Sequence, residues 1–408
     1  MNQLSAMPLL VMTVGVLIVL AILIRSGFER IRIPPLIGYM ALGFALNLVD
    51  SRLQFLNEVV RGGLEFLASL GVITLLFRVG LESDLPGLAR QFPRACVIWI
   101  GNMVLSAVLG YFTAYHLLGL ELIPSLFIAT ALTATSVGIS VAVWSEAGAI
   151  QSPLGEILVD AAEMDDITGV AIMALLFALA PVLRDGAEAS LLPVLAETGL
   201  LFLVKLIAFG AFCILFSRYA EHPLTHFFSK SRAAPQPMLF VAATGFIIAA
   251  LAEFLGFSVA IGAMFAGLVF SRDPEAVKLD AGFGTLCELF APFFFIGIGL
   301  HLDFASLSTA LGLGAVLLVP AILGKVIGAG GPALLMTGWA GAGLIGVSMV
   351  PRAEIAMIIM QQGYKLGEWA VPPEAFAGMV LVSAVTCIVT PLVAFSMLRR
   401  WPQKGTKA

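Results

Sequence analysis

The stretch GEILVDAAEMDDITGVAIMALLFALA (residues 155–180) places acidic side chains inside a run that is otherwise soluble in lipid. Asp160, Glu163, Asp165 and Asp166 fall within seven consecutive positions, and an apolar run follows directly. An ionised side chain at the centre of a bilayer costs roughly 2.5–3.5 kcal/mol on insertion scales. Such groups persist where they pair or line a hydrated cavity, so the stretch indicates a membrane-spanning helix that carries a cluster of charges.

The whole chain has the composition of a polytopic membrane protein. Of its 408 residues, 60% are hydrophobic and 12% are charged, and the mean hydropathy is +1.03. Apolar runs of about twenty residues recur from end to end, each long enough to cross a hydrocarbon layer as a helix. These values exclude a soluble protein. The four cysteines are scattered and form no metal or disulfide spacing, and nothing in the sequence indicates an enzyme or a bound cofactor.

Breaking the chain at charged and Pro/Gly-rich stretches predicts about thirteen transmembrane helices, the first of which has no signal-peptide features. The expected ranges are 7–25, 33–49, 60–80, 93–118, 122–145, 153–182, 191–217, 236–255, 257–271, 282–301, 307–329, 333–363 and 374–398. Sorting the Lys and Arg residues by alternate loops puts fourteen on one side of the membrane and four on the other. The C-terminus is therefore predicted to be cytoplasmic and the N-terminus outside.

Two short motifs recur seven helices apart. GLESD at residues 80–84 matches GLHLD at 299–303, and IGYMALG at 37–43 matches IGAMFAG at 261–267. Seven is an odd number, so matching helices cross in opposite directions, as an inverted-topology repeat requires. The predicted fold is an all-α integral membrane protein with two inverted repeats. The expected division is 1–184 for the first repeat, 185–232 for a linking helix and a cytoplasmic loop, and 233–408 for the second repeat with a short tail.

The polar centres of two expected helices become symmetry mates under this repeat. The helix at 122–145 gathers hydroxyl side chains at its middle, and the helix at 333–363 carries Pro351 at the corresponding position. Proline removes a backbone donor and disfavours helix just before it. Discontinuous helices at matching positions of two inverted halves mark the binding site of a transporter, where freed carbonyls coordinate a cation. Alternatively, the hydroxyls bond back to the preceding turn or to a neighbouring helix.

Three expected helices place ionisable groups at mid-membrane depth, namely Asp165, Asp166, Lys325, Arg352 and Glu354. Adjacent helical residues point about 100° apart, so one acid can face Lys325 while the other faces a cavity. Burial and a neighbouring like charge both strengthen the hold of a carboxyl group on its proton. A proton and a small metal cation then compete for the same oxygens, which is the chemistry of an antiporter. For Arg352 and Glu354, a buried structural ion pair is an equally good interpretation.

The two remaining acids of the stretch lie nearer its start. Glu163 shares a helical face with Asp166 because it lies three residues before it. With Asp160, it would extend a funnel that faces the cytoplasm. A polar helix end near the membrane surface is the alternative interpretation of both residues.

Seven motifs then occur in one order along the chain. They are PPLIGY (34–39), LFRVGLE (76–82), TATSVG (133–138), MDDITG (164–169), PFFF (292–295) before Gly299, LGK (323–325) and PRAE (351–354). In this order they resemble the bacterial monovalent cation:proton antiporter family of the NapA and Kef type, over essentially the whole chain. The resemblance implies a NapA-like antiporter fold and a homodimer. It also implies a moving core, here the helices expected at 93–182 and 307–398.

The resemblance assigns roles to individual residues. Asp166 resembles the carboxylate that binds the transported cation and the proton in turn, and Asp165 resembles its partner, which pairs with Lys325. Thr133 and Thr135 match the unwound segment of the first crossing helix, where they are expected to lend oxygen atoms.

The second crossing helix matches less closely. Arg352 and Glu354 match its paired charges, with a structural or modulating role. The family usually has glycine where this chain has Ala353, and Asp160 and Glu163 are additional acids. Kef-type members tend to lack the paired acids and append a nucleotide-binding domain, so the acids and the short stretch after the last apolar run favour the sodium-type branch.

The sequence thus predicts a secondary antiporter that exchanges Na⁺ or Li⁺ for H⁺ across a bacterial inner membrane. No cofactor is expected, and the expected partners are the transported ions, the lipid bilayer and a second copy of the chain. A K⁺/H⁺ antiporter on the same fold is the first alternative, because oxygen ligands do not define ion size. A cation channel or uniporter is the second alternative, since it would need no obligatory proton site.

Overall fold

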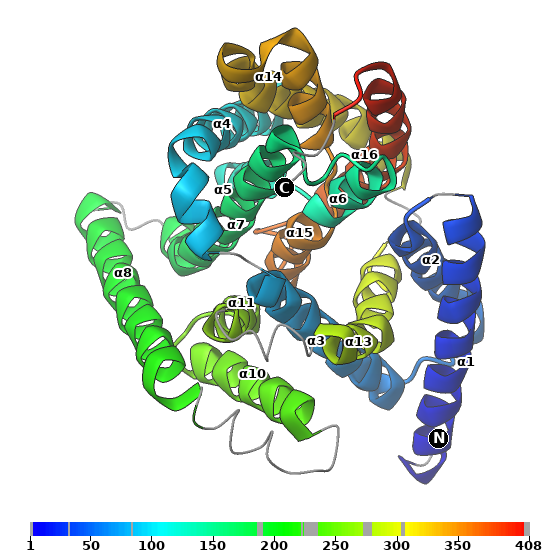
Figure 1. Cartoon of the computed structure of the whole chain (residues 1–408). Helices are drawn as coiled ribbons and strands as arrows, with labels where there is room; N and C mark the ends of the chain where they lie inside the picture. Colours follow the sequence, from blue (N-terminus) through cyan, green and yellow to red (C-terminus); the bar gives the residue numbers. More distant parts are fainter. Residues whose placement is uncertain are drawn as a thin grey trace. The chain divides into compact units, whose positions relative to one another are not determined.

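The computed structural model describes residues 3–31, 33–82, 85–185, 191–221, 223, 236–271, 280–302 and 307–403. All regular structure in these ranges is helical (Figure 1), which confirms the expected all-α class for the described part of the chain. Three residues of the two repeated motifs that end at 84 and 303, namely Ser83, Asp84 and Asp303, lie outside the described ranges.

Within the described ranges, ten helices are long and apolar enough to cross a membrane. Two further apolar helices are shorter, α10 (Gln236–Phe254) and α11 (Val259–Phe270). One of the ten candidate spans covers the 41 residues Ser308–Ser348. At about 1.5 Å per residue it would be about twice as long as a hydrocarbon core about 30 Å thick. The span therefore serves for more than one crossing, and the count of thirteen stays a prediction.

The expected boundary between the helices at 307–329 and 333–363 is wrong. Helix α14 (Leu307–Ser348) continues through Gly330, Gly331 and Pro332, and the non-helical residue inside it is Gly338, with φ 71° and ψ −179°. A Gly-Gly-Pro stretch breaks a soluble helix. Inside a membrane protein, neighbouring helices and local adjustments satisfy the freed backbone groups, so the helix tolerates it. Only glycine adopts the dihedral angles of residue 338 without strain.

The chain forms two compact units, and each draws on both expected repeats. Unit 1 comprises Met1–Asp84 and Leu200–Leu302, and unit 2 comprises Leu85–Gly199 and Asp303–Ala408. The helices of unit 1 are α1 (Gln3–Arg30), α2 (Pro35–Leu53), α3 (Glu58–Glu82), most of α8 (Leu191–Phe216), the π-helical turn η2 (Ser217–Glu221), α10, α11 and α13 (Asp280–Leu300). The helices of unit 2 are α4 (Leu85–Phe112), the π-helical turn η1 (Thr113–Leu117), α5 (Leu122–Thr133), α6 (Val137–Glu146), α7 (Pro153–Asp185), α14, α15 (Glu354–Leu366) and α16 (Pro373–Arg400). Unit 2 thus groups the helices that the resemblance places in one core.

Two helix pairs of unit 1 approach closely through glycine. A Cβ atom built on Gly43 of α2 would lie 3.0 Å from the Cα atom of Gly299 of α13. A Cβ atom built on Gly80 of α3 would lie 3.0 Å from the Cα atom of Gly267 of α11. Contacts this tight leave no room for a side chain, and small residues at helix interfaces are how membrane helices maximise their packing.

The two contacts are related by the offsets of the repeated motifs. A Cβ atom on Gly43 would lie 2.0 Å from the carbonyl oxygen of Ile296, and one on Gly267 would lie 2.1 Å from that of Phe77. Gly267 and Gly43 occupy the same place in the two IG motifs, while Ile296 and Phe77 each stand three residues before the GL motif. The contact between the last glycine of the IG motif and the residue three before the GL motif thus occurs twice. The IG motif comes from the first half in one case and from the second half in the other, which supports the predicted inverted repeat.

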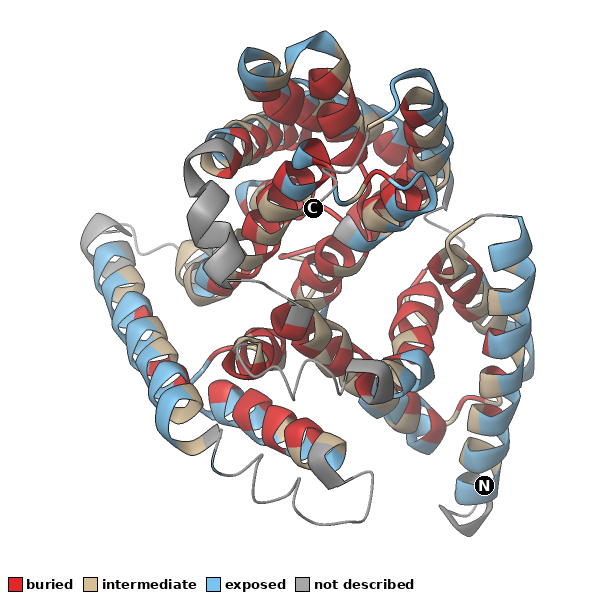
Figure 2. Ribbon diagram, viewed as in Figure 1, coloured by how far each residue is buried: buried red, intermediate tan, exposed pale blue. Residues whose placement is uncertain are grey.

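Burial differs sharply along the helices (Figure 2). Helix α15 of unit 2 is buried from Ile355 to Gln361, whereas α1 of unit 1 exposes large apolar residues such as Val11 and Ile22, at 66% and 62%. An apolar surface of this extent on a helix long enough to span a bilayer is one that lipid or another protein chain covers.

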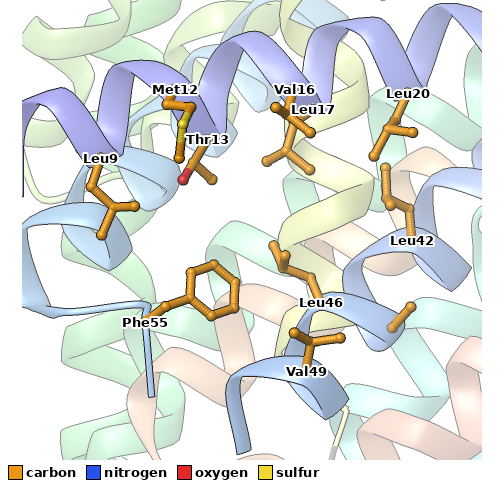
Figure 3. A pocket seen from close by; sticks show the side chains of 11 residues that line it. Leu9, Met12, Thr13, Val16, Leu17, Leu20, Leu42, Leu46, Val49 and Phe55 are labelled. Carbon is orange, nitrogen blue, oxygen red and sulfur yellow. The ribbon is translucent and has the colours of Figure 1, made fainter. Parts of the chain in front are cut away.

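An apolar cavity of about 340 Å³ lies in unit 1 between α1 and α2 (Figure 3). Its lining includes Leu9, Val16 and Leu46, and Thr13 is the one lining residue with a polar side chain. A cavity with this lining stays dry and offers a cation no oxygen ligands beyond one hydroxyl. The charged residues predicted for the functional site lie elsewhere, in unit 2.

The glycine contacts of unit 1 predict that added methyl groups destabilise the protein. Gly80→Ala should lower the stability by about 1–3 kcal/mol, because the new Cβ would lie 2.2 Å from the Met264 carbonyl oxygen and overpacking costs that amount. The matched control is Gly62→Ala on the same helix, where nothing lies within 4 Å of the added atom. Thermal unfolding in detergent measures both, and equal melting temperatures would contradict the described packing.

Candidate functional site in unit 2

Two interrupted helices meet in unit 2. Helix α5 ends at Thr133, Ala134 is extended with φ −65° and ψ 151°, and α6 begins at Val137. Hydroxyl side chains offer the backbone alternative hydrogen bonds, which favours a helix end at such a segment. The interruption that the sequence predicted within 122–145 is therefore confirmed.

The second interruption lies between α14 and α15, where Pro351 disfavours helix before it. The two interruptions contact each other directly. The backbone N–H of Ser136 donates to the carbonyl oxygen of Pro351 at 2.9 Å, and the Ser136 hydroxyl donates to Glu354 Oε2 at 2.5 Å. Figure 1 shows α5, α6 and α15 in unit 2, where α15 packs against α5. The predicted crossing of two discontinuous helices is thus present in unit 2.

Lys325 and Asp165 form a buried ion pair beside the first interruption. Their side chains are 0% and 1% exposed, and Lys325 Nζ lies 2.8 Å from Asp165 Oδ2. Lys325 Nζ also donates to the carbonyl oxygen of Thr133 at 2.5 Å and to Thr135 Oγ1 at 2.7 Å. All three N–H groups of the ammonium thus have oxygen acceptors. The expected pairing of Asp165 with Lys325 is confirmed.

The oxygen atoms expected from Thr133 and Thr135 are part of this cluster. The Thr133 carbonyl has no helical partner because α5 ends there, so it is free to accept from Lys325. The Thr135 hydroxyl donates to Asp165 Oδ2 at 2.6 Å while it accepts from Lys325. The Thr133 carbonyl oxygen and the Thr135 hydroxyl oxygen therefore both accept from the lysine ammonium.

Asp166 points to a different environment from that of its neighbour. It is 5% exposed, and its Oδ1 atom is buried with no hydrogen-bond partner among the described residues. The carboxyl groups of Asp165, Glu354 and Glu163 and the ammonium of Lys325 all act on its charge. The ion pairs of the described residues include none with Asp166. A buried acid among other acids needs a proton or a cation to balance it.

Arg352 does not form an ion pair with Glu354. Its fully buried guanidinium donates through Nη1 to the carbonyl oxygens of Met349 and Val350, at 3.1 and 2.9 Å, and through Nη2 to that of Ala321 at 3.2 Å. It therefore caps the carbonyl end of the helix before the second interruption, where a cation also suits the helix dipole. The interpretation of Arg352 and Glu354 as a buried ion pair is wrong, since Glu354 accepts from Ser136 instead.

The two outer acids of the stretch, Asp160 and Glu163, lie earlier on α7 than the adjacent pair. Glu163 and Asp160 are both half-buried, and both make interactions with other groups. Glu163 is near enough to act on the charge of Asp166, which fits its predicted place on the same helical face. The funnel assigned to the two acids stays a prediction.

Asn102 is a residue of the site that the sequence analysis missed. Its side chain is buried on α4, and Nδ2 donates to Asp165 Oδ2 at 2.5 Å. A signal was present, because an amide in the apolar run of α4 is costly in lipid and marks a side chain that faces protein. Its partner stands 63 positions further along the chain, and no local pattern identifies a partner at that distance.

Two interrupted helices that cross beside buried ionisable side chains define a secondary transporter. Residues 15–400 match the family described as "Sodium/hydrogen exchanger, transmembrane". The chain therefore belongs to the sodium/hydrogen exchanger family, which confirms the class of protein expected from its motifs. Its family and fold are those of an antiporter, and the chain is a multi-pass membrane protein.

Several characterised relatives cover most of the chain. The high-affinity Na⁺/H⁺ antiporter NhaS3 of Synechocystis sp. is 29% identical over 332 residues, which are 80% of this chain and 69% of the relative. The Na⁺/H⁺-K⁺ antiporter GerN of Bacillus cereus is 29% identical over 328 residues, covering 80% and 81%. A Na⁺/H⁺ antiporter of Enterococcus hirae is 28% identical over 382 residues, covering 92% and 95%.

The fold is shared with a solved antiporter. The sodium proton antiporter MjNhaP1 from Methanocaldococcus jannaschii, determined at pH 8, superposes with a TM-score of 0.69 over 97% of each chain, at 14% sequence identity. At this identity the likeness concerns the fold alone.

The buried pair predicts a characteristic pattern of stabilities. Lys325→Met and Asp165→Asn should each destabilise the protein, the first by about 3–5 kcal/mol, because removing one partner leaves an uncompensated buried charge. The double variant should recover most of the loss, since a buried pair replaced by neutral groups of similar volume is nearly neutral.

Thermal unfolding of the four proteins in detergent measures this pattern. The matched control is Lys205→Met, because Lys205 is an exposed lysine of α8 whose bond goes to the Leu255 carbonyl oxygen at 3.2 Å. A double variant whose loss of stability equals the sum of the two single losses would show that the two side chains do not depend on each other.

Proposed function

We propose that the protein exchanges Na⁺, or the smaller Li⁺, for H⁺ by alternating access, with Asp166 as the carboxyl group that both ions share. The observation that carries the proposal is the contrast between adjacent acids. Asp165 is neutralised by Lys325, whereas Asp166 is buried with an unpartnered oxygen and no cationic partner in the described ion pairs. Membership of the sodium/hydrogen exchanger family supports the same ions.

The exchange follows from charge balance at Asp166. A buried carboxylate is stabilised either by taking a proton or by binding a monovalent cation, and the two exclude each other on the same oxygens. Release of one ion on one side of the membrane therefore prepares the site for the other ion. Thr133, Thr135 and Glu354 lie at the interrupted helices, where freed carbonyls and carboxylates can complete the oxygen ligands of the transported cation.

The surroundings are proposed on the same basis. The protein lies in a bacterial inner membrane with its N-terminus outside and its C-terminus cytoplasmic, because the basic residues favour one side. It is a transporter and not an enzyme, works without a cofactor and forms a homodimer in the lipid bilayer. Repeats at 1–184 and 233–408, joined by 185–232, supply the two symmetric halves that alternating access uses.

Asp166→Asn should abolish coupled exchange in proteoliposomes, to the level of liposomes without protein. An amide keeps the shape of the side chain but neither binds an exchangeable proton nor carries the charge that attracts a cation. Sodium-driven proton movement, followed with a pH-sensitive dye, measures the loss. The matched control is Glu156→Gln, which neutralises an acid in the first turn of the same helix that is exposed; its rate should stay close to that of the unchanged protein.

The same variant separates the antiporter from a channel or uniporter. If Asp166→Asn still passed Na⁺ without moving protons, the site would be a conduction path and not a shared binding site. Coupled exchange at the normal rate in Asp166→Asn would overturn the role of the carboxyl group altogether.

A K⁺/H⁺ antiporter is the second candidate, favoured by the relative GerN, whose description names K⁺ beside Na⁺ and H⁺. Carboxylate and carbonyl oxygens accept several hard cations, so the residues of the site admit both ions. Dissipation of a preformed pH gradient by Na⁺, Li⁺ or K⁺ separates the two functions. We expect Na⁺ and Li⁺ to dissipate it at concentrations at least about tenfold lower than K⁺, a difference of about 1.4 kcal/mol in binding; the reverse order would establish the potassium antiporter.

A further inference from the structure

Asn102 lies beside a close approach of α4 and α14 within unit 2. A Cβ atom built on Gly101 would lie 2.7 Å from the Gly328 carbonyl oxygen, and one built on Gly328 would lie 2.9 Å from the Gly101 carbonyl oxygen. The Cβ atom on Gly328 would also lie 3.0 Å from the Cα atom of Asn102. The two backbones are thus in contact beside Asn102. Gly328, the residue of α14 at this contact, lies three residues after Lys325.

The Asn102 amide is one of three donors that converge on a single oxygen. Asp165 Oδ2 accepts from Asn102 Nδ2 at 2.5 Å, from Thr135 Oγ1 at 2.6 Å and from Lys325 Nζ at 2.8 Å. The three donors come from α4, from the first interruption and from α14. Of the three donors, Lys325 can change its charge and Thr135 can rotate its hydroxyl, whereas the Asn102 amide does neither. Asn102 is therefore the donor whose state stays the same.

The second carboxylate oxygen of Asp165, Oδ1, accepts none of these three hydrogen bonds. Asp165 Oδ1 and Asp166 Oδ1 are both buried and have no hydrogen-bond partner among the described residues. Buried polar atoms are nearly always satisfied in native proteins, and carboxylate oxygens on adjacent residues are ligands for a hard cation. The atoms left over by the hydrogen-bond network are therefore the ones that the transported ion can use.

We propose that Asn102 is a positioning residue for the transported cation. Asn102 donates to Oδ2 of Asp165 beside Thr135 and Lys325, and so fixes the orientation of the carboxylate. Oδ1 of the same carboxylate is then placed to bind the cation that Asp166 binds. The inference rests on the proposed function, because it needs Asp166 to bind the transported ion, and it adds Oδ1 of Asp165 as a further ligand. Side chains that orient metal-binding carboxylates in this way typically contribute about 10–100-fold to metal affinity.

The test compares Asn102→Leu with Ser106→Ala. Leucine has nearly the shape of asparagine but cannot donate to Asp165. Ser106 lies one turn further along the same face of α4, is equally buried, and its hydroxyl has no partner among the described residues. Asn102→Leu should raise the KM for Na⁺ about tenfold and leave the maximal rate per folded protein within about twofold, the signature of lost ion binding. Ser106→Ala should leave both unchanged.

Two further variants address folding and chemistry. Asn102→Ala removes the donor without steric conflict and should raise the KM as Asn102→Leu does. Asn102→Gln retains the amide and should recover most of the affinity. An equal rise in Asn102→Gln and Asn102→Leu would show that shape, and not the amide, matters at this position. Loss of folded protein in all three would mark Asn102 as a packing residue, and either result would overturn the inference.

Direct binding separates this inference from the proposed function. Stabilisation of the purified protein by added Na⁺ follows its dissociation constant, and that constant should also rise about tenfold in Asn102→Leu. If the unchanged protein bound Na⁺ but exchanged no protons, the proposed function would be wrong. The dissociation constant of Asn102→Leu for Na⁺ would still test the role of Asn102. If exchange was normal and neither the KM nor the binding constant of Asn102→Leu changed, the role of Asn102 alone would fall.

Discussion

The structure of unit 2 depends on the burial of one lysine ammonium inside a membrane-spanning helix. Lys325 is fully buried, and each of its three N–H groups meets an oxygen atom, from Thr133, Thr135 and Asp165. In a continuous helix the Thr133 carbonyl would accept from the backbone four residues on. The interruption of α5 frees that carbonyl to accept from Lys325. The carbonyl lowers the cost of burying the ammonium, and the ammonium lowers the cost of leaving the carbonyl without a helical partner.

The second interruption follows the same electrostatic rule. Arg352 donates to the carbonyl groups at the end of α14, as Lys325 does at the end of α5. A cation at the carbonyl end of a half-helix is favoured by the helix dipole. Both buried cations thereby have partners: Lys325 donates to a carboxylate, a carbonyl and a hydroxyl oxygen, and Arg352 donates to carbonyl oxygens. Asp166 is buried and forms no ion pair among the described residues, which is why we propose that it holds the exchangeable ion.

Much of this site followed from the sequence, through two different routes. The adjacent acids and the hydroxyl cluster before Ser136 indicated a functional site by their cost in lipid, and the motif resemblance paired Asp165 with Lys325. Asn102 was missed, and one of the two interpretations of Arg352 paired it with Glu354, which is not its partner. Both errors have one cause: their acceptors are defined by where other helices lie, and a polar residue in an apolar run reveals that it has a partner without revealing which one.

The sequence by itself determined that the chain spans a membrane, that two of its apolar segments are interrupted, and that acids lie within an apolar run. These are properties of composition and of local backbone chemistry, because the bilayer penalises each exposed charge and each unpaired backbone group wherever it occurs. Only the tertiary structure decided that α14 continues through Pro332 and is interrupted at Gly338, that Arg352 binds carbonyls, and that Asn102 reaches Asp165. Hydrogen bonds act over about 3 Å, so the choice among distant partners is made by packing and not by position along the chain.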